Sequence, residues 1–366
     1  MKGMLQWMGI GIAAACAASV GLFGATSTYF SSHQGKACTS CHEMAQFVTG
    51  AHGSAHRNLK CQDCHQESLR TKLRHVRAHL AGHLPEMIRM RDTDVLQMNE
   101  NCRGCHQHEY AAWKAGPHSA TYRQIFADPQ ENSRRRLADD CLRCHGMHFD
   151  GAIGDLVQPQ DVRGPWRIVR RDLAEAPTMP CSSCHWIHRD GTPQSKPASR
   201  ISVAGSPFSD SLGFYDRREQ MHFAAPGLSI PQVYEGATPV RMSPDQRQTI
   251  CYQCHAPRFP DATTPAAAHG WRAAQAGSGD DRTPMGVHEG LSCFACHNGH
   301  NENARASCKS CHQKTSECGV DVESMDTSYA SASSRHNIHW VRCVDCHAKG
   351  VPQPKSHSSG MVAAAD

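Results

Sequence analysis

The stretch Cys102-Arg-Gly-Cys105-His106 is one of nine copies of the pattern Cys-x-x-Cys-His in this chain of 366 residues. The nine copies begin at Cys38, Cys61, Cys102, Cys141, Cys181, Cys251, Cys293, Cys308 and Cys343. Together they use 18 of the 20 cysteines, and the gaps between successive copies vary widely. The motif is therefore the internal repeat of this chain, although it recurs without a fixed period.

Each copy brings two thiols and one imidazole together within five residues. Two thiols at this spacing add to the two vinyl groups of one haem, and the histidine that follows reaches the iron from the same side. The second cysteines are Cys41, Cys64, Cys105, Cys144, Cys184, Cys254, Cys296, Cys311 and Cys346, and the motif histidines are His42, His65, His106, His145, His185, His255, His297, His312 and His347. The pattern predicts nine covalently bound haems c, with these histidines as iron ligands.

Two other uses of cysteine fit the pattern poorly. A disulfide framework does not require a histidine after every second cysteine. Zinc ribbons pair two Cys-x-x-Cys units at a fairly fixed separation and need no trailing histidine, whereas two copies here start only 15 residues apart, at Cys293 and Cys308. We therefore favour haem attachment over both.

The content of hydrophobic and aromatic residues is low for a chain of this length. Hydrophobic residues make up 39% and aromatic residues 6%, and porphyrins would supply the missing apolar surface. We expect a mostly α and irregular fold, with short helices, long loops and little or no sheet. The formal net charge is only +4, and Arg134–Arg136 is an isolated basic run, so nucleic-acid binding has no support.

The N-terminus carries an apolar stretch from Met8 to Ala25 that follows Lys2. Its length suits a single transmembrane helix, and the positive-inside tendency keeps Lys2 in the cytoplasm. The alternatives are a cleaved signal peptide and, less favoured, a lipoprotein modified at Cys16. We expect an inner-membrane protein with one pass and with its haem domains in the periplasm.

The motifs divide the chain into three predicted parts: an anchor at 1–30, a tetrahaem domain at 31–150 and a pentahaem domain at 151–366. Residues 151–180 are a predicted junction, and the haem-free insertion 190–250 a predicted partner surface or channel. Between the second and third motifs, Thr71–Met90 is predicted to form a helix with His75, His79 and His83 on one face, and Pro85 is a candidate for the end of the helix or for a kink in it.

Seventeen histidines remain once the nine motif histidines are set aside from the 26 in the chain. Multihaem proteins of low potential usually give each iron a second histidine. The predicted second ligands are His56, His118, His148, His188, His222, His288, His300 and one of His336 and His339. Three of them, His148, His188 and His300, follow a motif histidine by three residues, too close to reach the other face of the same iron. Each is therefore expected to serve a neighbouring haem, while His33, His52, His108 and His357 are not expected to bind iron.

The first motif continues as Cys38-Thr-Ser-Cys41-His42-Glu43-Met44 after the apolar helix and is followed by SAHRNLKCQDCH. Over residues 1–150 this resembles the NapC/NirT family of membrane-anchored quinol dehydrogenases. The resemblance implies that Met44 or His42 binds iron at the first haem and that His56 serves the fourth. It also implies a quinol site after the second motif, where Arg77, His79, His83 and Glu86 are candidates.

These patterns favour an electron conduit, which takes electrons from the membrane quinol pool and passes them to a periplasmic or outer-membrane redox protein. The alternative is a quinol-linked reductase of a small nitrogen or sulfur oxyanion, which needs a haem with an open distal site. Enzyme activity beyond quinol oxidation is left open, as is a homo-oligomer. Cys318 is expected to be a free or intermolecularly paired thiol.

Overall fold

The computed structural model describes residues 2–32, 44–65, 74, 77–82, 90–133, 136–159, 163–188, 211–235, 237–255, 282–300, 304–312 and single positions between 338 and 349. The chain forms two compact units. The first comprises Met1–Ala198, Ser206–Leu228 and Gly299–Glu302, and the second Ser199–Gly205, Ser229–Asn298 and Asn303–Asp366.

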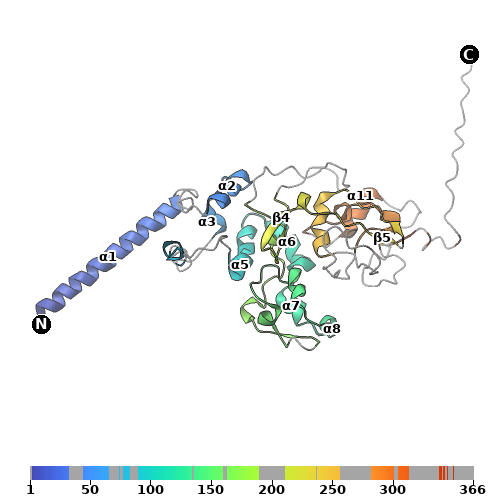
Figure 1. Cartoon of the computed structure of the whole chain (residues 1–366). Helices are drawn as coiled ribbons and strands as arrows, with labels where there is room; N and C mark the ends of the chain where they lie inside the picture. The colour runs from blue at the N-terminus through green and yellow to red at the C-terminus, as the bar shows by residue number, and fades with distance from the viewer. Residues whose placement is uncertain are drawn as a thin grey trace, which may run out of the picture. The chain divides into compact units, whose positions relative to one another are not determined.

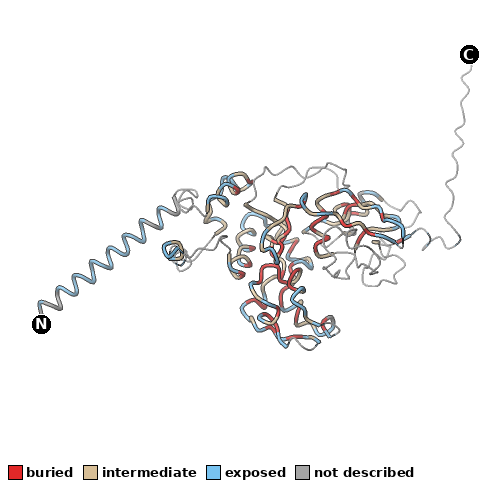
Figure 2. Tube along the Cα trace, viewed as in Figure 1, coloured by how far each residue is buried: buried red, intermediate tan, exposed pale blue. Residues whose placement is uncertain are grey.

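Helix α1 (Lys2–Ser32) is a single continuous element whose described side chains are exposed (Figures 1 and 2). Its segment Trp7–Tyr29 has a mean hydropathy of 1.8 and is about 35 Å long at the rise of an α-helix. The hydroxyls of Ser19 and Thr28 donate to carbonyls one turn earlier, so neither is left unsatisfied. The helix is therefore long and apolar enough to cross a membrane.

The remaining helices are short, as the composition predicts. In the first unit they are α2 (Ala45–Gly53), α3 (Cys61–Cys64), α5 (Asp92–Arg103), α6 (Gln107–Ala115), η3 (Pro117–Ser119), α7 (Tyr122–Phe126), α8 (Pro129–Asn132), η4 (Asp139–Arg143), α9 (Ile153–Leu156), η5 (Arg171–Leu173), η6 (Cys181–Ser183) and η7 (Ala225–Gly227). In the second unit they are η8 (Gln246–Thr249), η9 (Cys251–Gln253), η11 (Gly286–His288), α10 (Cys293–Cys296), η12 (Ala304–Ser307) and α11 (Cys308–Cys311).

Sheet is confined, in the described chain, to three antiparallel strand pairs: β1 (Val157–Gln158) with β2 (Arg167–Ile168), β3 (Gly213–Asp216) with β4 (Met221–Ala224), and β5 (Tyr234–Glu235) with β6 (Thr238–Pro239). The β3–β4 hairpin places Tyr215 directly opposite His222. The predicted fold class, mostly α and irregular with little sheet, is confirmed.

The first unit has an apolar core built from segments between residues 96 and 174. Its centre is Tyr122 and Phe126 on α7, which pack against Leu142, Leu156 and their neighbours. A capping box begins α7, because the side chains of Thr121 and Gln124 each accept from the backbone N–H of the other. The predicted boundary after residue 150 falls inside this core, and the division into four-haem and five-haem domains stays a prediction.

The predicted helix over Thr71–Met90 is interrupted by a turn at residues 81–82, before Pro85, and residues 83–89 lie outside the described chain. Residues 77–80 are helical, but the chain turns at 81–82, where Gly82 has a φ of 66°. Glycine adopts this left-handed conformation readily and commonly ends helices. His79 therefore lies in the last helical turn, and His83 lies outside the described residues.

Candidate functional site

All seven described motifs share one backbone geometry. The motif histidine donates its N–H to the carbonyl of the first cysteine, which closes a single helical turn. The N···O distances are 2.8 Å for His65, His106, His255 and His297, 2.9 Å for His145, 3.0 Å for His185 and 2.7 Å for His312. The turn holds both cysteines and the histidine close together at every site, as covalent attachment of one haem requires.

The cysteines of these seven motifs are free thiols in the described chain. The disulfide alternative therefore receives no support from the motifs that the structure describes. The first and ninth motifs, Cys38–His42 and Cys343–His347, lie outside the described residues. The number of haems thus stays a prediction at nine. Haem sites are numbered below by motif, from site 1 at Cys38 to site 9 at Cys343.

Five motif histidines in the described chain face a second histidine at a consistent separation. The ring centroids are 5.8 Å apart for His65 and His188, 6.0 Å for His56 and His106, 5.8 Å for His185 and His300, 6.5 Å for His288 and His312, and 6.1 Å for His297 and His339. A metal–imidazole bond is about 2 Å long, so two imidazoles on opposite sides of one metal have centroids roughly 6 Å apart. These ring pairs fit the two axial positions of haem iron.

Helix α2 positions His188 opposite His65. The ring of Phe47 lies 5.5 Å from the ring of His188 at a steep angle. Gly50 on the same helix packs against the His188 backbone so closely that a Cβ would lie 1.5 Å from its carbonyl oxygen. Desolvation, and next the neighbouring His65, lowers the pKa of His188 to about 4. The imidazole is therefore neutral, the form that binds metal.

His56 lies beside His106 of the third motif, with ring centroids 6.0 Å apart, and its service to the fourth haem stays a prediction. The turn that carries His56 follows α2 and leads into the second motif. Asn101 on α5 donates to the Cys64 carbonyl at 2.6 Å and so ties the second motif to the third. This tie brings the turn of His56 next to His106.

His300 lies beside His185 and belongs to the first unit, although its sequence neighbour His297 belongs to the second. The two rings are almost parallel, with an interplanar angle of 11°. Desolvation, and then the nearby His300, lowers the pKa of His185 to about 4. The spacing rule that sends such a histidine to another motif agrees with this placement.

In the second unit, His288 faces His312, and His297 faces His339. His288 donates from Nδ1 to the carbonyl of Ile338 at 3.3 Å. This hydrogen bond leaves Nε2 as the nitrogen that would bind a metal. His336, the other histidine considered with His339, lies outside the described residues.

Two amides that the sequence analysis missed hold motifs together. Asn99 accepts from the backbone N–H of Cys181 at 2.9 Å, and Gln248 accepts from the N–H of Cys293 at 3.3 Å. Each amide lies three residues before the first cysteine of another motif, at Cys102 and Cys251 respectively. That shared position is the signal that could have found them.

His148 and His222 meet at a different place, in a cluster with Tyr215. The His148 ring stacks on Tyr215 with centroids 4.0 Å apart, and His222 lies 5.2 Å from the same ring. His222 donates from Nε2 to the Ser182 carbonyl at 2.7 Å, while Nε2 of His148 lies 3.1 Å from the Ser182 hydroxyl. Desolvation, and next His222, lowers the pKa of the buried His148 to about 3. Their roles as iron ligands stay predictions.

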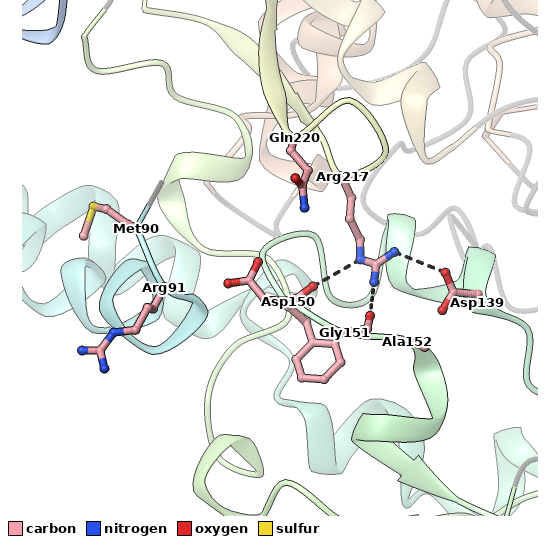
Figure 3. A pocket seen from close by; sticks show the side chains of 9 residues that line it. Met90, Arg91, Asp139, Asp150, Gly151, Ala152, Arg217 and Gln220 are labelled. Atoms are coloured by element: carbon pink, nitrogen blue, oxygen red, sulfur yellow. Dashed lines mark hydrogen bonds and ion pairs between the residues drawn. The ribbon is translucent and has the colours of Figure 1, made fainter. Parts of the chain in front are cut away.

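A pocket of about 620 Å³ lies beside the turn of the β3–β4 hairpin (Figure 3). Arg217 reaches from that turn to Asp139 and to the carbonyls of Phe149 and Gly151. Asp139 begins the turn that carries the fourth motif. Because Arg217 donates to three protein oxygens, it fastens the hairpin to the fourth motif.

The other predicted site residues stay predictions. Met44 precedes α2 and is half-buried, and His118 lies on η3 with an exposed side chain. Among the quinol-site candidates, Arg77 is exposed and His79 half-buried. His42, His83, Glu86 and Cys318 lie outside the described residues.

Residues 101–162 match the family described as cytochrome c554 and c-prime. The matched segment contains the third and fourth motifs and much of the core of the first unit. The chain is a multihaem c-type cytochrome. The cytochrome carries covalently bound haem c and transfers electrons. No curated protein and no solved structure shows significant similarity to it.

Proposed function

We propose that this cytochrome is a membrane-anchored electron conduit with nine haems. It takes electrons from quinol at site 1 and passes them to a periplasmic or outer-membrane redox protein. Bound haem supplies the one-electron redox chemistry. The apolar helix α1 supports the anchor, since Trp7 and Tyr29 bracket a stretch of membrane length and aromatic residues favour the two membrane interfaces.

The observation that carries this proposal is the pairing of imidazoles. An iron with two axial histidines has no coordination position for a substrate. Five of the seven described motif histidines already have a histidine at the matching separation. Sites of this kind suit electron transfer and do not suit catalysis at iron.

The quinol-dehydrogenase part of the proposal comes from the resemblance of residues 1–150 to the NapC/NirT family. Met44 or His42 would be the axial ligand at site 1. A quinol releases protons as it is oxidised, so a base must lie near its oxygen. His79, half-buried at the end of its helical turn, and the exposed Arg77 are the described candidates.

The test uses the full-length holoprotein in liposomes with a menaquinol analogue. Stopped-flow absorbance is expected to show quinol-dependent haem reduction, followed by reoxidation when an external electron acceptor is added. His79→Ala should slow the reduction by quinol and leave the reduction by dithionite unchanged. His108→Ala, on the exposed face of α6, is the matched control. Reduction by dithionite with none by quinol would overturn the quinol step.

The cluster of His148, Tyr215 and His222 favours a second candidate, the reductase of a small nitrogen or sulfur oxyanion. Two imidazoles and a phenol converge there next to the fifth motif, and these groups transfer protons in reductive chemistry. Under this alternative, the ferric protein has a high-spin haem besides any at site 1, and purified reduced protein is reoxidised by nitrite or hydroxylamine alone. An electron conduit shows neither.

A further inference from the structure

The geometry points to site 5 as the site that connects sites 2 and 3 within the first unit. Its iron would be held by His185 and His300. Its motif is paired directly with the third motif, and its following histidine, His188, is the second ligand of site 2. The inference deepens the proposed electron conduit and rests on it for the electron-transfer function of these sites. The test of this inference measures the coordination of the iron and needs no quinol.

The ligand pair is the first step of the argument. His185 and His300 lie in the same unit with ring centroids 5.8 Å apart and nearly parallel planes. His300 cannot share an iron with His297, because the two are only three residues apart and His297 faces His339. His300 is therefore assigned to site 5.

The contact between the third and fifth motifs is the second step. Asn99 on α5 stands three residues before Cys102, the first cysteine of the third motif. Asn99 fixes this contact, since its side chain accepts from the backbone N–H of Cys181. This hydrogen bond joins the segment of the third motif to the fifth, so haems held at sites 3 and 5 would be neighbours although the fourth motif separates these motifs in sequence.

The link from site 5 to site 2 is the third step. His188 faces His65 and follows His185 by three residues, a span of at most about 10 Å between Cα atoms. Site 2 also approaches site 3, because Asn101, the residue before Cys102, donates to the Cys64 carbonyl at 2.6 Å. Sites 2, 3 and 5 therefore form a contiguous group.

The second unit repeats the same construction independently. Gln248 accepts from the N–H of Cys293 at 3.3 Å, and the same amide oxygen lies 3.6 Å from the Cys293 sulfur. Gln248 stands three residues before Cys251, as Asn99 stands three residues before Cys102. In both cases the second motif of the pair continues as Cys-x-x-Cys-His-x-x-His, and its last histidine, His188 or His300, faces the motif histidine of a different site. The fifth and seventh motifs thus share one arrangement, in which the last histidine would bind the iron of another site.

This arrangement gives an order of sites that differs from the order of motifs. Haems held at sites 2, 3 and 5 would allow one-electron transfer from site 2 or site 3 directly to site 5. The fourth motif is not needed for this step. His300 itself follows the motif histidine of the seventh motif, His297, by three residues.

The test is the coordination state of the iron in the full-length holoprotein. His300→Ala is expected to convert one low-spin haem into a high-spin haem that binds one carbon monoxide per protein. The same substitution is then made with Cys181→Ala and Cys184→Ala, which remove one haem by intact mass. In that background His300→Ala is expected to add no further high-spin haem, because its site is gone. A new high-spin haem in that background would overturn the assignment, as would a low-spin spectrum in the single variant.

Methionine variants keep the test decisive if the cysteine variant does not fold. An axial methionine raises the reduction potential of a haem. His185→Met and His300→Met, alone and combined, are expected to shift one and the same haem in a redox titration. His288→Met combined with His300→Met is the matched control and shifts two haems, since His288 faces His312. Two shifted haems in the His185→Met/His300→Met protein would refute the shared iron, whatever the response to quinol.

Discussion

At the scale of single residues, Gly50 shows how a position without a side chain sets the geometry of an iron ligand. Its contact with the His188 backbone leaves no space for a Cβ. His188 in turn faces His65 from across site 2. The close approach of α2 therefore determines where the second ligand of this site lies.

Gly50→Ala is expected to destabilise the first unit and to weaken ligation at site 2. Alanine favours helix more than glycine by about 1 kcal/mol, but overpacking costs roughly 1–3 kcal/mol, so the net change is a loss. Thermal unfolding and the low-spin signal of the ferric protein measure the two effects. Gly227→Ala, where a Cβ meets nothing within 4 Å, should change neither. Equal stability of the two variants would show that α2 does not hold His188.

At the scale of elements, the repeated motif predicts its own backbone, and the described copies agree with it. A single turn closed by the histidine N–H recurs at every described site. The β3–β4 hairpin was not predicted, because residues 190–250 carry few local signals and the hairpin is fixed by distant partners. Arg217 ties it to the loop of Phe149 and Gly151, and Arg218 pairs with Asp140. Helix ends also depend on local conformation, as Gly82 shows.

Helix α1 carries a prediction at this scale. Ala18→Arg places a charge near the middle of the segment Trp7–Tyr29, where insertion into a bilayer then costs about 2.5–3.5 kcal/mol more. The variant is expected to be depleted from the membrane fraction, while Ala18→Leu stays there. Intact mass separates an anchor from a signal peptide, since an anchor retains residues 1–32. A mature protein that lacks these residues would disprove the anchor.

At the scale of the whole molecule, four of the five ring pairs in the described chain fall into two geometric classes, while the planes of His65 and His188 meet at an intermediate 33°. The planes of His185 and His300 and of His297 and His339 meet at 11° and 13°. The planes of His56 and His106 and of His288 and His312 meet at 79° and 80°. Parallel and perpendicular axial imidazoles give different low-spin signals in electron paramagnetic resonance.

The ferric protein is therefore expected to show both a rhombic low-spin signal and one with a large maximum g value. His300→Ala should decrease the rhombic signal, and His288→Ala the other. The two variants serve as controls for each other, because each removes a ligand from a different class. A spectrum of a single class would contradict the ring geometry.

The sequence could predict which histidines face another motif better than it could predict which motif each one faces. The spacing in the fifth and seventh motifs sent His188 and His300 to other motifs, and both face another motif histidine. Which motif receives each one depends on packing between distant segments, and spacing does not contain that information. For the same reason the resemblance, which assigns His56 to the fourth haem, does not contain the contact of His56 with His106. Asn99 and Gln248 were missed because their only signal in the sequence, a shared position three residues before a first cysteine, does not show which motif each amide binds.

The origin of His300 has a consequence for biogenesis. A chain that crosses a membrane from its N-terminus exposes residues 181–185 well before residue 300. Under the proposed assignment, a haem attached to the fifth motif at that stage would be held by His185 without His300, and its iron would be open to dioxygen. Maturation of this centre is accordingly expected to be the oxygen-sensitive stage of biosynthesis.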